Sequence, residues 1–557
     1  MGESSAGAAT FLESIFAKLS ENPRTTFLQE ARSGKGSSAS GAELISLISQ
    51  ARAFLRSAGL KRGDRCALHA SNSVRWVATD LAIMAEGLIA VPLYSRQAAS
   101  ELAGMLRDCS PALVISGDAS LRDAIAREWP EHPRIAVFEE IFAEEAAQTS
   151  EPPVPLRPND AVTIIYTSGT SGEAKGVILT AGNLDHMLRC TSERLNDLMA
   201  AYSGQDHVFH YLPFCFAGSW ILLLTSLLRG NLLTLATDLA KLAEDMRAAS
   251  PHYFLNVPVL LERMRTGVDE QIRKTGGVIH AIYEHAKDSW FRRRMGDESA
   301  SRFWIWLANL LVFPTIRKKM IGGNLRGLIC GSAPLGVETQ LYFTMLAIPV
   351  LQVYGLTETT AICTMDRPGR VEPGFVGPAI PEVEMRLGDQ DEILVRGPNL
   401  FAGYWNRAEA TANAMRDGWF HTGDQGEVNE AGNWRIIGRL KNLIVLSSGH
   451  NVAPEPIEEM ILHLLADAQQ VVLVGHGKPF VAAIVTGNVT REEVNEALEI
   501  ANPQWPHYKR VRSFLIHAEP FSVENGLLTA NGKLRREAIN ARFQTQIEEM
   551  YSATPAA

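Results

Sequence analysis

One segment of the chain has the composition of a phosphate-binding loop. Residues 167–176 hold four hydroxyl side chains, three glycines and one lysine, directly after an apolar run that ends at Tyr166. Glycines let backbone N–H groups converge on an anion, hydroxyls add donors, and Lys175 supplies a positive charge. A Walker A loop needs glycine before its lysine, and Ala174 stands there instead. The segment therefore predicts phosphate binding by another kind of loop, with an ordinary polar turn as the alternative.

Five further motifs follow in the chain. They are GSAPL at 331–335, YGLTETT at 354–360, GWFHTGD at 418–424, GRLKN at 438–442 and NGKLR at 531–535. Together with YTSGTSGEAKG at 166–176, their order resembles that of the adenylate-forming, or AMP-binding, superfamily, which includes acyl-CoA synthetases, luciferases and peptide-synthetase adenylation domains. The resemblance implies a reaction in two halves. A carboxylate attacks the α-phosphate of ATP to give an acyl-adenylate and pyrophosphate, and a thiol then takes the acyl group and releases AMP.

The same resemblance implies a role for each motif. Glu358, with Thr357 beside it, is expected to be catalytic and to hold Mg²⁺, which prefers oxygen ligands. Lys533 is expected to neutralise charge on the carboxylate and the α-phosphate, and Lys441 to be the hinge of a mobile C-terminal domain. The residues expected to contact ATP or AMP are Thr167, Ser168, Gly169, Thr170, Ser171, Gly172, Lys175, Gly331, Ser332, Ala333, Pro334, Tyr354, Gly355, Asp424 and Arg439.

Each of these side chains also has a purely structural interpretation. Tyr354 fits an adenine-stacking face and also a core aromatic position. Glu358 fits a carboxylate that caps a helix, and Asp424 fits an Asx-turn. Arg439 fits a surface ion pair, and Lys533 fits a solvated lysine. The ordered set of motifs favours the functional interpretation in each case.

The acyl group is expected to be a long-chain fatty acid. Segments such as IGRLKNLIVLSSGHNVAPEPIEEM at 437–460 resemble bacterial long-chain fatty acyl-CoA ligases. The apolar stretch 211–224 suits a tunnel wall, in which Phe216 and Trp220 are the predicted acyl contacts. Trp220 matches in spacing a tryptophan that gates the tunnel in some of these ligases, and core packing is the alternative. Phe216 departs from the family, since many relatives have histidine there.

The acceptor thiol is expected to be that of coenzyme A, with Gly449 lining its channel as the resemblance implies. Transfer to the pantetheine of a carrier protein stays open, as does aryl-acid or luciferase-like activation, and so does a non-catalytic acyl or nucleotide binder. A non-catalytic relative would be free to lose Lys533 or Glu358, and the chain retains both. The predicted cofactors and substrates are ATP, Mg²⁺ and coenzyme A.

The secondary structure expected around these motifs predicts an α/β protein. Apolar runs at 64–70, 90–94, 112–116, 161–166 and 325–330 predict buried strands, and 42–60 has the period of an amphipathic helix. Strands that alternate with helices favour layered parallel sheets. We expect a large N-terminal domain over 1–437 with a β-rich subdomain at 371–437. A hinge at 438–442 and a small mobile α+β domain at 443–557 would follow it.

Length, charge and cysteine content further narrow the class of protein. The chain has 557 residues, more than one domain's length, and a formal net charge of −9, which argues against general nucleic-acid binding. Its six cysteines show no C-x-x-C spacing, which favours a reducing cytoplasm without a zinc or disulfide framework. Neither a secretory signal nor a membrane span is expected. The sequence does not indicate the oligomeric state.

One segment has a net positive charge, although the whole chain is negative. Residues 263–320 contain 12 Lys and Arg against 6 Asp and Glu, together with the aromatic run SRFWIWLANLLVF. Basic segments with Trp and Phe bind at membrane surfaces. Peripheral contact with the inner membrane surface is therefore one expectation, and a helical pair with solvated charges is the other.

Overall fold

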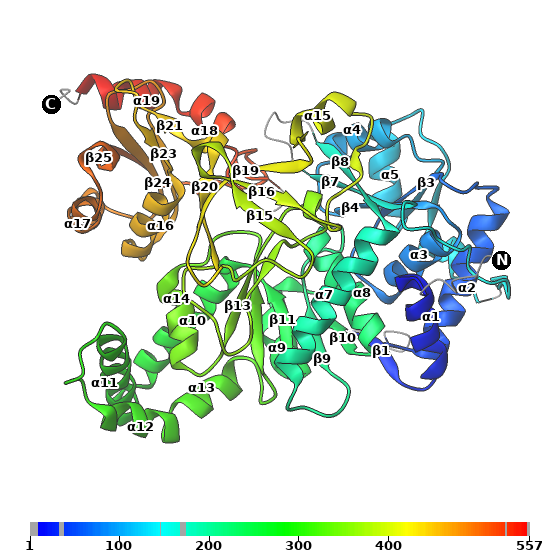
Figure 1. The fold of residues 1–557 in the computed structure, drawn as a ribbon, viewed down its shortest axis with the longest axis horizontal. Helices are drawn as coiled ribbons and strands as arrows, with labels where there is room; N and C mark the ends of the chain where they lie inside the picture. The colour runs from blue at the N-terminus through cyan, green and yellow to red at the C-terminus, as the bar shows by residue number, and fades with distance from the viewer. Residues whose placement is uncertain (1–8, 33–37, 145, 168–173, 530–531, 554–557) are drawn as a thin grey trace. The chain divides into compact units, whose positions relative to one another are not determined.

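The computed structural model describes residues 9–32, 38–144, 146–167, 174–529 and 532–553. Strands and helices alternate along most of the chain (Figure 1). The chain divides into two compact units. Unit 1 comprises 1–384, 395–420 and 430–434, and unit 2 comprises 385–394, 421–429 and 435–557. The predicted class, a large α/β N-terminal domain followed by a separate smaller domain, is confirmed.

Unit 1 contains a seven-stranded sheet. In order across the sheet, the strands are β17 (Gly403–Tyr404), β8 (Lys175–Thr180), β7 (Ala161–Thr167), β4 (Ile89–Leu93), β3 (Arg65–His69), β5 (Leu113–Ser116) and β6 (Ile135–Val137). The strands from β7 to β6 are parallel to their neighbours, whereas β8 pairs antiparallel with β7 and β17. Helices cover parallel strands on both faces, so their sequences read as continuous apolar runs.

A second sheet of unit 1 has eight strands. Their order is β14 (Thr364–Met365), β13 (Val350–Tyr354), β12 (Gly327–Cys330), β11 (Tyr253–Asn256), β9 (His207–His210), β10 (Leu232–Leu235), β1 (Thr26–Glu30) and β2 (Ser38–Ser40). The strands from β13 to β1 are parallel, and the two outermost strands are antiparallel. The carboxyl ends of the parallel strands therefore meet along one edge.

The helices of unit 1 fill the connections between these strands. They are α1 (Phe11–Glu21), α2 (Gly41–Ser57), α3 (Val74–Ala85), α4 (Ala99–Cys109), α5 (Ala119–Glu128), α6 (Phe138–Ile141), α7 (Ala181–Met199), α8 (Ala217–Arg229), α9 (Leu242–Ala249), α10 (Pro258–Thr275), α11 (Gly277–Arg294), α12 (Arg302–Leu311), α13 (Phe313–Met320), α14 (Val337–Met345) and α15 (Ala408–Ala414). The helix predicted at 42–60 is α2. The Ser40 hydroxyl accepts from the Glu43 backbone, and the Glu43 carboxylate accepts from the Ser40 backbone, which forms a capping box.

The β-rich stretch predicted after residue 370 contains short strands. They are β15 (Glu384–Leu387), β16 (Glu392–Arg396), β18 (Met415–Arg416), β19 (Trp419–Val428) and β20 (Trp434–Arg439), and β20 pairs with β19. A Cβ atom on Gly426 of β19 would lie 2.9 Å from the Arg435 carbonyl oxygen of β20, so this pairing favours glycine there. The composition of the segment, rich in Gly and Pro, thus matches tight strand pairing and turns.

The C-terminal part of unit 2 contains a two-stranded sheet of β21 and β22, and a three-stranded sheet of β23, β24 and β25 with helices on both faces. Its elements are β21 (Ile444–Val445), β22 (Asn451–Val452), α16 (Glu455–Leu464), β23 (Ala468–Val474), β24 (Val481–Gly487), α17 (Arg491–Ala501), β25 (Val511–His517), α18 (Arg536–Arg542) and α19 (Gln544–Ala553). Side chains of a strand alternate between the two faces. Val471 and Leu473 accordingly belong to the core with Ile457 of α16, whereas Val472 packs with Ile539 of α18.

Three further observations bear on the predictions. All six cysteines are buried and free. Among the described residues, no helix combines the length and apolar character that a membrane span requires. Residues 385–394 and 421–429 group with the C-terminal residues, a division that differs in detail from the predicted cut at 438–442. The predicted domain boundaries stay predictions.

Candidate active site

The carboxyl edge of the eight-stranded sheet gathers several predicted site residues. Gly331 to Pro334 follow β12, and Tyr354 ends β13, its parallel neighbour. Phe216 lies in the segment between β9 and α8 and therefore leaves from the same edge. Ligands of open α/β sheets bind at such carboxyl ends. The topology of unit 1 thus brings predicted nucleotide contacts and one predicted acyl contact to one edge.

The loop after β13 is tightly wound. A Cβ atom on Gly355 would lie 2.3 Å from the Ala361 carbonyl oxygen, so no larger residue fits. Thr360 and Ala361 both have positive φ, at 52° and 87°. Thr357 to Thr359 form one turn of 3₁₀ helix. This geometry determines the direction in which the Glu358 side chain extends from the loop. Thr360 and Ala361 are strained, because residues other than glycine rarely adopt positive φ.

Tyr404 connects two of the predicted residues. Its hydroxyl donates to Glu358 Oε1 at 2.8 Å, and the ammonium nitrogen of Lys175 lies 5.2 Å from the centre of its ring. Tyr404 is on β17, which pairs with β8, the strand that begins at Lys175. The Phe401 backbone N–H also donates to the Glu358 carbonyl oxygen at 2.9 Å. Lys175, which ends the phosphate loop, and Glu358, the predicted metal ligand, therefore both contact Tyr404.

Tyr404 was not among the residues predicted from the sequence. It lies in the segment RGPNLFAGYWN at 396–406, which is outside the six motifs. No spacing rule distinguishes this tyrosine from a core aromatic, because its neighbours come from β8 and from the loop after β13.

The phosphate loop itself joins β7 and β8. Thr167 and Lys175 are opposite each other in this antiparallel pair, and the Thr167 hydroxyl donates to the Lys175 carbonyl oxygen at 3.4 Å. The predicted contacts Ser168, Gly169, Thr170, Ser171 and Gly172 lie outside the described residues. The two ends of the loop thus lie side by side at the end of a hairpin, as a phosphate cradle requires.

The environment of Glu358 fits a magnesium ion held partly by substrate. Glu358 offers a carboxylate and Thr357 a neighbouring hydroxyl, which are hard oxygen donors. No cluster of three or more His, Cys, Asp or Glu side chains suited to a metal occurs in the part of the chain that the structure describes. Mg²⁺ is commonly held by one or two carboxylates together with substrate phosphates. Glu358 would be the protein's ligand in such an arrangement.

Asp424 and Arg439 form an ion pair within unit 2. Arg439 Nε lies 2.6 Å from Asp424 Oδ1, across the hairpin of β19 and β20. Asp424 is buried, and its backbone N–H donates to the Thr422 hydroxyl at 3.0 Å. A buried carboxylate held by an arginine is fixed in position and keeps lone pairs for further donors such as hydroxyl groups.

Lys441 and Lys533 lie within electrostatic range of each other. Loss of hydration lowers the pKa of Lys441 to about 8; Arg439 and Lys533 contribute in the same direction, and Asp424 and Glu537 oppose them. Lys533 ends a tight turn, where its carbonyl oxygen accepts from the Thr529 N–H at 2.8 Å. Within unit 2, the predicted hinge residue and the predicted catalytic lysine therefore belong to one electrostatic cluster.

A buried network anchors the segment that carries Lys533. The Arg536 guanidinium donates two hydrogen bonds to Glu458, at 2.7 and 2.5 Å. Glu458 also accepts from the Leu473 N–H at 2.6 Å, and Arg536 lies 3.7 Å from Glu455. Asn442 of the predicted hinge donates to Glu455 at 2.6 Å. The network thus joins the hinge, α16, β23 and α18, and the sequence did not reveal it.

Gly449, the predicted coenzyme A contact, lies in the turn between β21 and β22. Its φ is 82°, and its N–H donates to the Leu446 carbonyl oxygen at 2.9 Å. A residue with a side chain is strained at this φ, so the turn favours glycine. The turn is exposed. The helix α16 begins a few residues later, at Glu455, with Pro456 in its first turn.

The two predicted acyl contacts have different surroundings. Phe216 is half-buried, precedes α8 and packs against Tyr94 with ring centres 5.9 Å apart. Trp220 is fully buried, and its indole N–H donates to Asp80 Oδ2 at 2.8 Å. Asp80 is equally buried, which raises its pKa to about 7. Trp220 therefore occupies a core position here, which matches its structural alternative, and its gating role stays a prediction.

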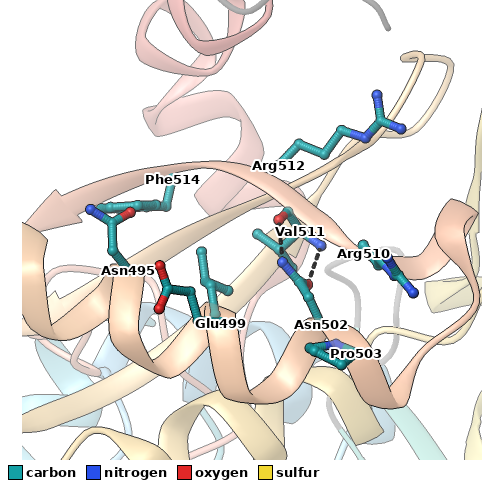
Figure 2. A pocket seen from close by; sticks show the side chains of 9 residues that line it. Asn495, Glu499, Asn502, Pro503, Arg510, Val511, Arg512 and Phe514 are labelled. Carbon is teal, nitrogen blue, oxygen red and sulfur yellow. Dashed lines mark hydrogen bonds between the residues drawn. The ribbon is translucent and has the colours of Figure 1, made fainter.

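A hollow of about 440 Å³ lies on unit 2, apart from every predicted site residue. Figure 2 shows it between α17 and β25, where Asn502 exchanges two hydrogen bonds of 2.9 Å with the backbone of Val511. Its lining residues are Asn495, Leu498, Glu499, Asn502, Pro503, Arg510, Val511, Arg512 and Phe514. The Asn502 contacts join the end of α17 to β25, so this hollow is a feature of the domain's scaffold.

Comparison with known families gives two matches. The profile of the family described as "AMP-binding enzyme" matches residues 15–405, and that described as "AMP-binding enzyme C-terminal domain" matches residues 441–555. The resemblance inferred from the six motifs is confirmed.

Among curated proteins, the chain is similar to long-chain acyl-CoA ligases. It is 27% identical to the long-chain-fatty-acid–CoA ligase FadD15 of Mycobacterium bovis, over 97% of this chain and 96% of that protein. It is 28% identical to long-chain-fatty-acid–CoA ligase 6 of Homo sapiens, over 87% of this chain and 78% of that protein.

Solved structures share the fold. ATP-bound MatB from Rhodopseudomonas palustris superposes with a TM-score of 0.73 at 23% identity, covering 96% of this chain and 99% of that one. A Mycobacterium tuberculosis fatty acyl CoA synthetase gives a TM-score of 0.66 at 22% identity, covering 96% of this chain and 99% of that one.

Proposed function

The chain belongs to the AMP-binding enzyme family, and from that premise we propose that it is a long-chain fatty acid:CoA ligase that forms AMP. In the first half-reaction, a carboxylate oxygen of the acid attacks the α-phosphorus of ATP. The bond from that phosphorus to the bridging oxygen breaks, and pyrophosphate leaves. In the second half-reaction, the thiol sulfur of coenzyme A attacks the acyl carbon, loses its proton, and AMP leaves.

The arrangement of Lys175, Tyr404 and Glu358 is the observation that carries this proposal. It holds a cation and a carboxylate next to one phenol, beside a hairpin whose loop has the composition of a phosphate cradle. Both half-reactions build or move negative charge, so the protein's main task is to position groups and stabilise charge. Glu358 would hold Mg²⁺, which would supply positive charge against the phosphates of ATP.

The remaining residues are assigned by the chemistry they can do. Tyr354, half-buried at the end of β13, offers an aromatic face for adenine. Asp424, held by Arg439, would accept from the ribose hydroxyls. Lys533 would neutralise the carboxylate and α-phosphate in the first half-reaction. Lys441 would be the hinge that withdraws Lys533 before the second.

Long-chain acids are supported by two observations. The relatives reported above are named as long-chain ligases, at 27% and 28% identity. The stretch around Phe216 is apolar, with Tyr94 against it, which disfavours small polar acids. Coenzyme A as acceptor is supported by the names of the same relatives. A carrier-bound pantetheine is the second candidate, because Gly449 would serve either thiol. A cytoplasmic location stays a prediction from cysteine usage.

Pyrophosphate release across a panel of acids of increasing chain length, with and without coenzyme A, tests the proposal. Release should depend on ATP and Mg²⁺ and rise with chain length. Mass spectrometry should find acyl-CoA only when coenzyme A is added. Acyl-adenylate that accumulates with coenzyme A present and is consumed by a carrier protein would favour the second acceptor. No release with any acid would overturn the enzyme assignment.

A further inference from the structure

The helix α12 exposes apolar side chains on the face that points away from the core. Trp304, Leu307 and Ala308 pack inward, against the core of unit 1. Phe303, Trp306 and Leu310 are 57%, 59% and 60% exposed, and their spacing of three and four residues places them together on one face. Leu311 beside them is 56% exposed. The helix is therefore apolar on two faces, whereas a surface helix ordinarily has a polar outer face.

This exposed face belongs to a well-anchored element. The Trp304 ring of α12 stacks on His285 of α11, with ring centres 4.8 Å apart. The helix α11 is held in turn, because its Tyr283 hydroxyl donates to the Tyr342 hydroxyl of α14 at 3.1 Å. Lys287 pairs with Asp269 at 2.9 Å. Figure 1 shows α11 and α12 apart from the sheet that contains β9, β11 and β13. Since the inner contacts already fix α12, its outer side chains are not needed to hold the helix in place.

The chain segment that carries the apolar face is basic. Residues 299–337 contain five basic and no acidic side chains, in a chain of net charge −9. Of these, Arg302 at the start of α12 and Lys318 and Lys319 of α13 are exposed. Lys318 and Lys319 also line a hollow of about 520 Å³ with Pro314 and Thr315. The surface thus combines aromatic and aliphatic side chains with flanking cations.

We propose that the outer face of α12, with Arg302, Lys318 and Lys319 at its rim, binds the surface of an anionic lipid bilayer. Phe303, Trp306 and Leu310 would enter the boundary between headgroups and acyl chains, where Trp is favoured, and the cations would meet anionic headgroups. With ten residues, α12 can lie in the interface and cannot cross it. The inference rests on the surface alone and not on the proposed reaction.

Charge favours a bilayer over a second copy of this chain. A two-fold dimer through α12 would bring the same basic rim of each copy against the other, and such like-charge contact is unfavourable. An anionic bilayer offers the opposite charge and an apolar interior to the same face.

Flotation of the purified full-length chain with vesicles tests the proposal. One set of vesicles is phosphatidylcholine alone, and the other contains added phosphatidylserine. The chain should float with the anionic vesicles, and salt should weaken binding. The pair Trp306→Ser/Leu310→Ser should lower the partition coefficient at least about ten-fold. Lys318→Gln/Lys319→Gln should lower it about five-fold for each charge removed.

Two controls keep the result specific. Ile500→Ser removes a side chain of matched exposure, 55%, from α17 of unit 2 and should leave binding unchanged. Brominated lipid should quench wild-type fluorescence more than that of Trp306→Phe. Far-ultraviolet circular dichroism and thermal unfolding of each variant establish that it is folded.

Three outcomes would overturn the proposal. Equal flotation with neutral and anionic vesicles would remove the role of the basic rim. Equal binding of the wild type and the Trp306→Ser/Leu310→Ser variant would remove the role of α12. Dimerisation without lipid that this variant abolishes, with no flotation of the wild type, would make a second copy the occupant of the face.

Discussion

At the residue scale, the phenol of Tyr404 controls how two charges of the site are held. Its hydroxyl restrains the Glu358 carboxylate, and its ring faces the Lys175 ammonium. A hydrogen bond to a charged group contributes more than one between neutral groups, about 1.5–3 kcal/mol. Tyr404 is therefore a positioning residue, which acts on catalysis through Glu358 and Lys175.

We expect Tyr404→Phe to lower kcat/KM for pyrophosphate release roughly 10- to 100-fold, since each 1.4 kcal/mol corresponds to a factor of ten. The apparent requirement for Mg²⁺ should rise as well, because Glu358 loses its restraint. Tyr404→Leu, which also removes the ring beside Lys175, should be slower still. Initial rates at subsaturating ATP measure kcat/KM, and a titration of Mg²⁺ at saturating ATP measures the Mg²⁺ requirement.

Tyr202→Phe is the matched control for this substitution. The Tyr202 hydroxyl donates to the Gln205 carbonyl oxygen at 3.4 Å, in another part of unit 1. Its removal should leave both kcat/KM and the Mg²⁺ requirement unchanged. If Tyr404→Phe lowered kcat without any change in the Mg²⁺ titration, the hydroxyl would not act through Glu358.

A second prediction at this scale concerns the buried pair of Asp80 and Trp220. Burial raises the pKa of Asp80 from 3.8 to about 7, against the opposing hydrogen bond from Trp220. Between these two values, the native state holds a proton that the unfolded chain has released. The free energy of unfolding should therefore fall as pH rises through this window, by up to about 1.4 kcal/mol per pH unit.

Asp80→Asn cannot release a proton, so it isolates this contribution. Urea unfolding of both proteins at pH values from about 5 to 8 should show the wild type losing stability relative to the variant as pH rises. Two stability curves that stay parallel over this range would show that Asp80 does not titrate as burial predicts.

The residue scale also shows how far the sequence predicts the site. Tyr354, Gly355 and Glu358 were found because their neighbours along the chain form a motif. Tyr404 and Arg536 were not, because their partners lie far away in sequence and meet them only through strand and helix packing. A motif search finds local patterns, whereas a hydrogen bond between distant segments leaves no local pattern.

At the element scale, the network of Glu458 and Arg536 determines whether the segment with Lys533 is held to the rest of its unit. Both side chains are largely buried, and Glu458 joins α16 to β23 and α18 through its two oxygens. A buried ion pair contributes little relative to an apolar pair, yet removing one partner leaves an uncompensated charge. Removing one partner of this network therefore tests how firmly the segment with Lys533 is held, although the intact pair adds little net stability.

We expect Glu458→Gln to destabilise unit 2 by about 3–5 kcal/mol, because Arg536 would stay charged and buried without its partner. Hydrogen exchange of β23 and α18, followed by mass spectrometry, measures the local loss of protection. The double variant Glu458→Leu/Arg536→Met should recover most of the stability.

Glu548→Gln provides the comparison, since it makes the same change in the same unit at an exposed pair. Glu548 accepts from Lys478 at 2.6 Å with 56% of its side chain exposed, and such pairs contribute about 0–1 kcal/mol. A similar loss of protection in both variants would contradict a special role for the buried network.

Elements themselves were largely predictable where a pattern is periodic. The strands expected at 64–70 and 112–116 are β3 and β5, and the helix expected at 42–60 is α2. The exchange of 385–394 and 421–429 into unit 2 was not foreseen. The division into compact units depends on which strands pair. The hydrophobic pattern of β19 or of β20 does not indicate its partner, so this pairing could not be predicted.

At the scale of the whole molecule, the proposed mechanism needs residues 443–557 to move about Lys441, a hinge that lies inside unit 2. Lys441 and Lys533, the proposed hinge and catalytic lysine, belong to unit 2 and lie within electrostatic range of each other. A lysine required in one half-reaction and not in the other is the signature of such a domain movement.

We expect Lys533→Ala to lower acyl-adenylate formation about 100-fold or more, as loss of a charge-stabilising donor does. Thioester formation from supplied acyl-adenylate and coenzyme A should change little. ATP–pyrophosphate exchange measures the first half-reaction, and release of AMP from synthetic acyl-adenylate measures the second. Lys509→Ala, a change of the same type in unit 2, should affect neither. An equal loss in both half-reactions would exclude the hinge model.

The distribution of thiols makes this movement accessible to spectroscopy. All six cysteines are buried, and all six belong to unit 1, so unit 2 contains none. Burial raises the pKa of Cys66 and Cys330, which further suppresses the reactive thiolate. A single cysteine introduced on the surface of unit 2 would consequently react with a maleimide dye almost alone. Native protein could then be labelled at one chosen point without first removing its own cysteines.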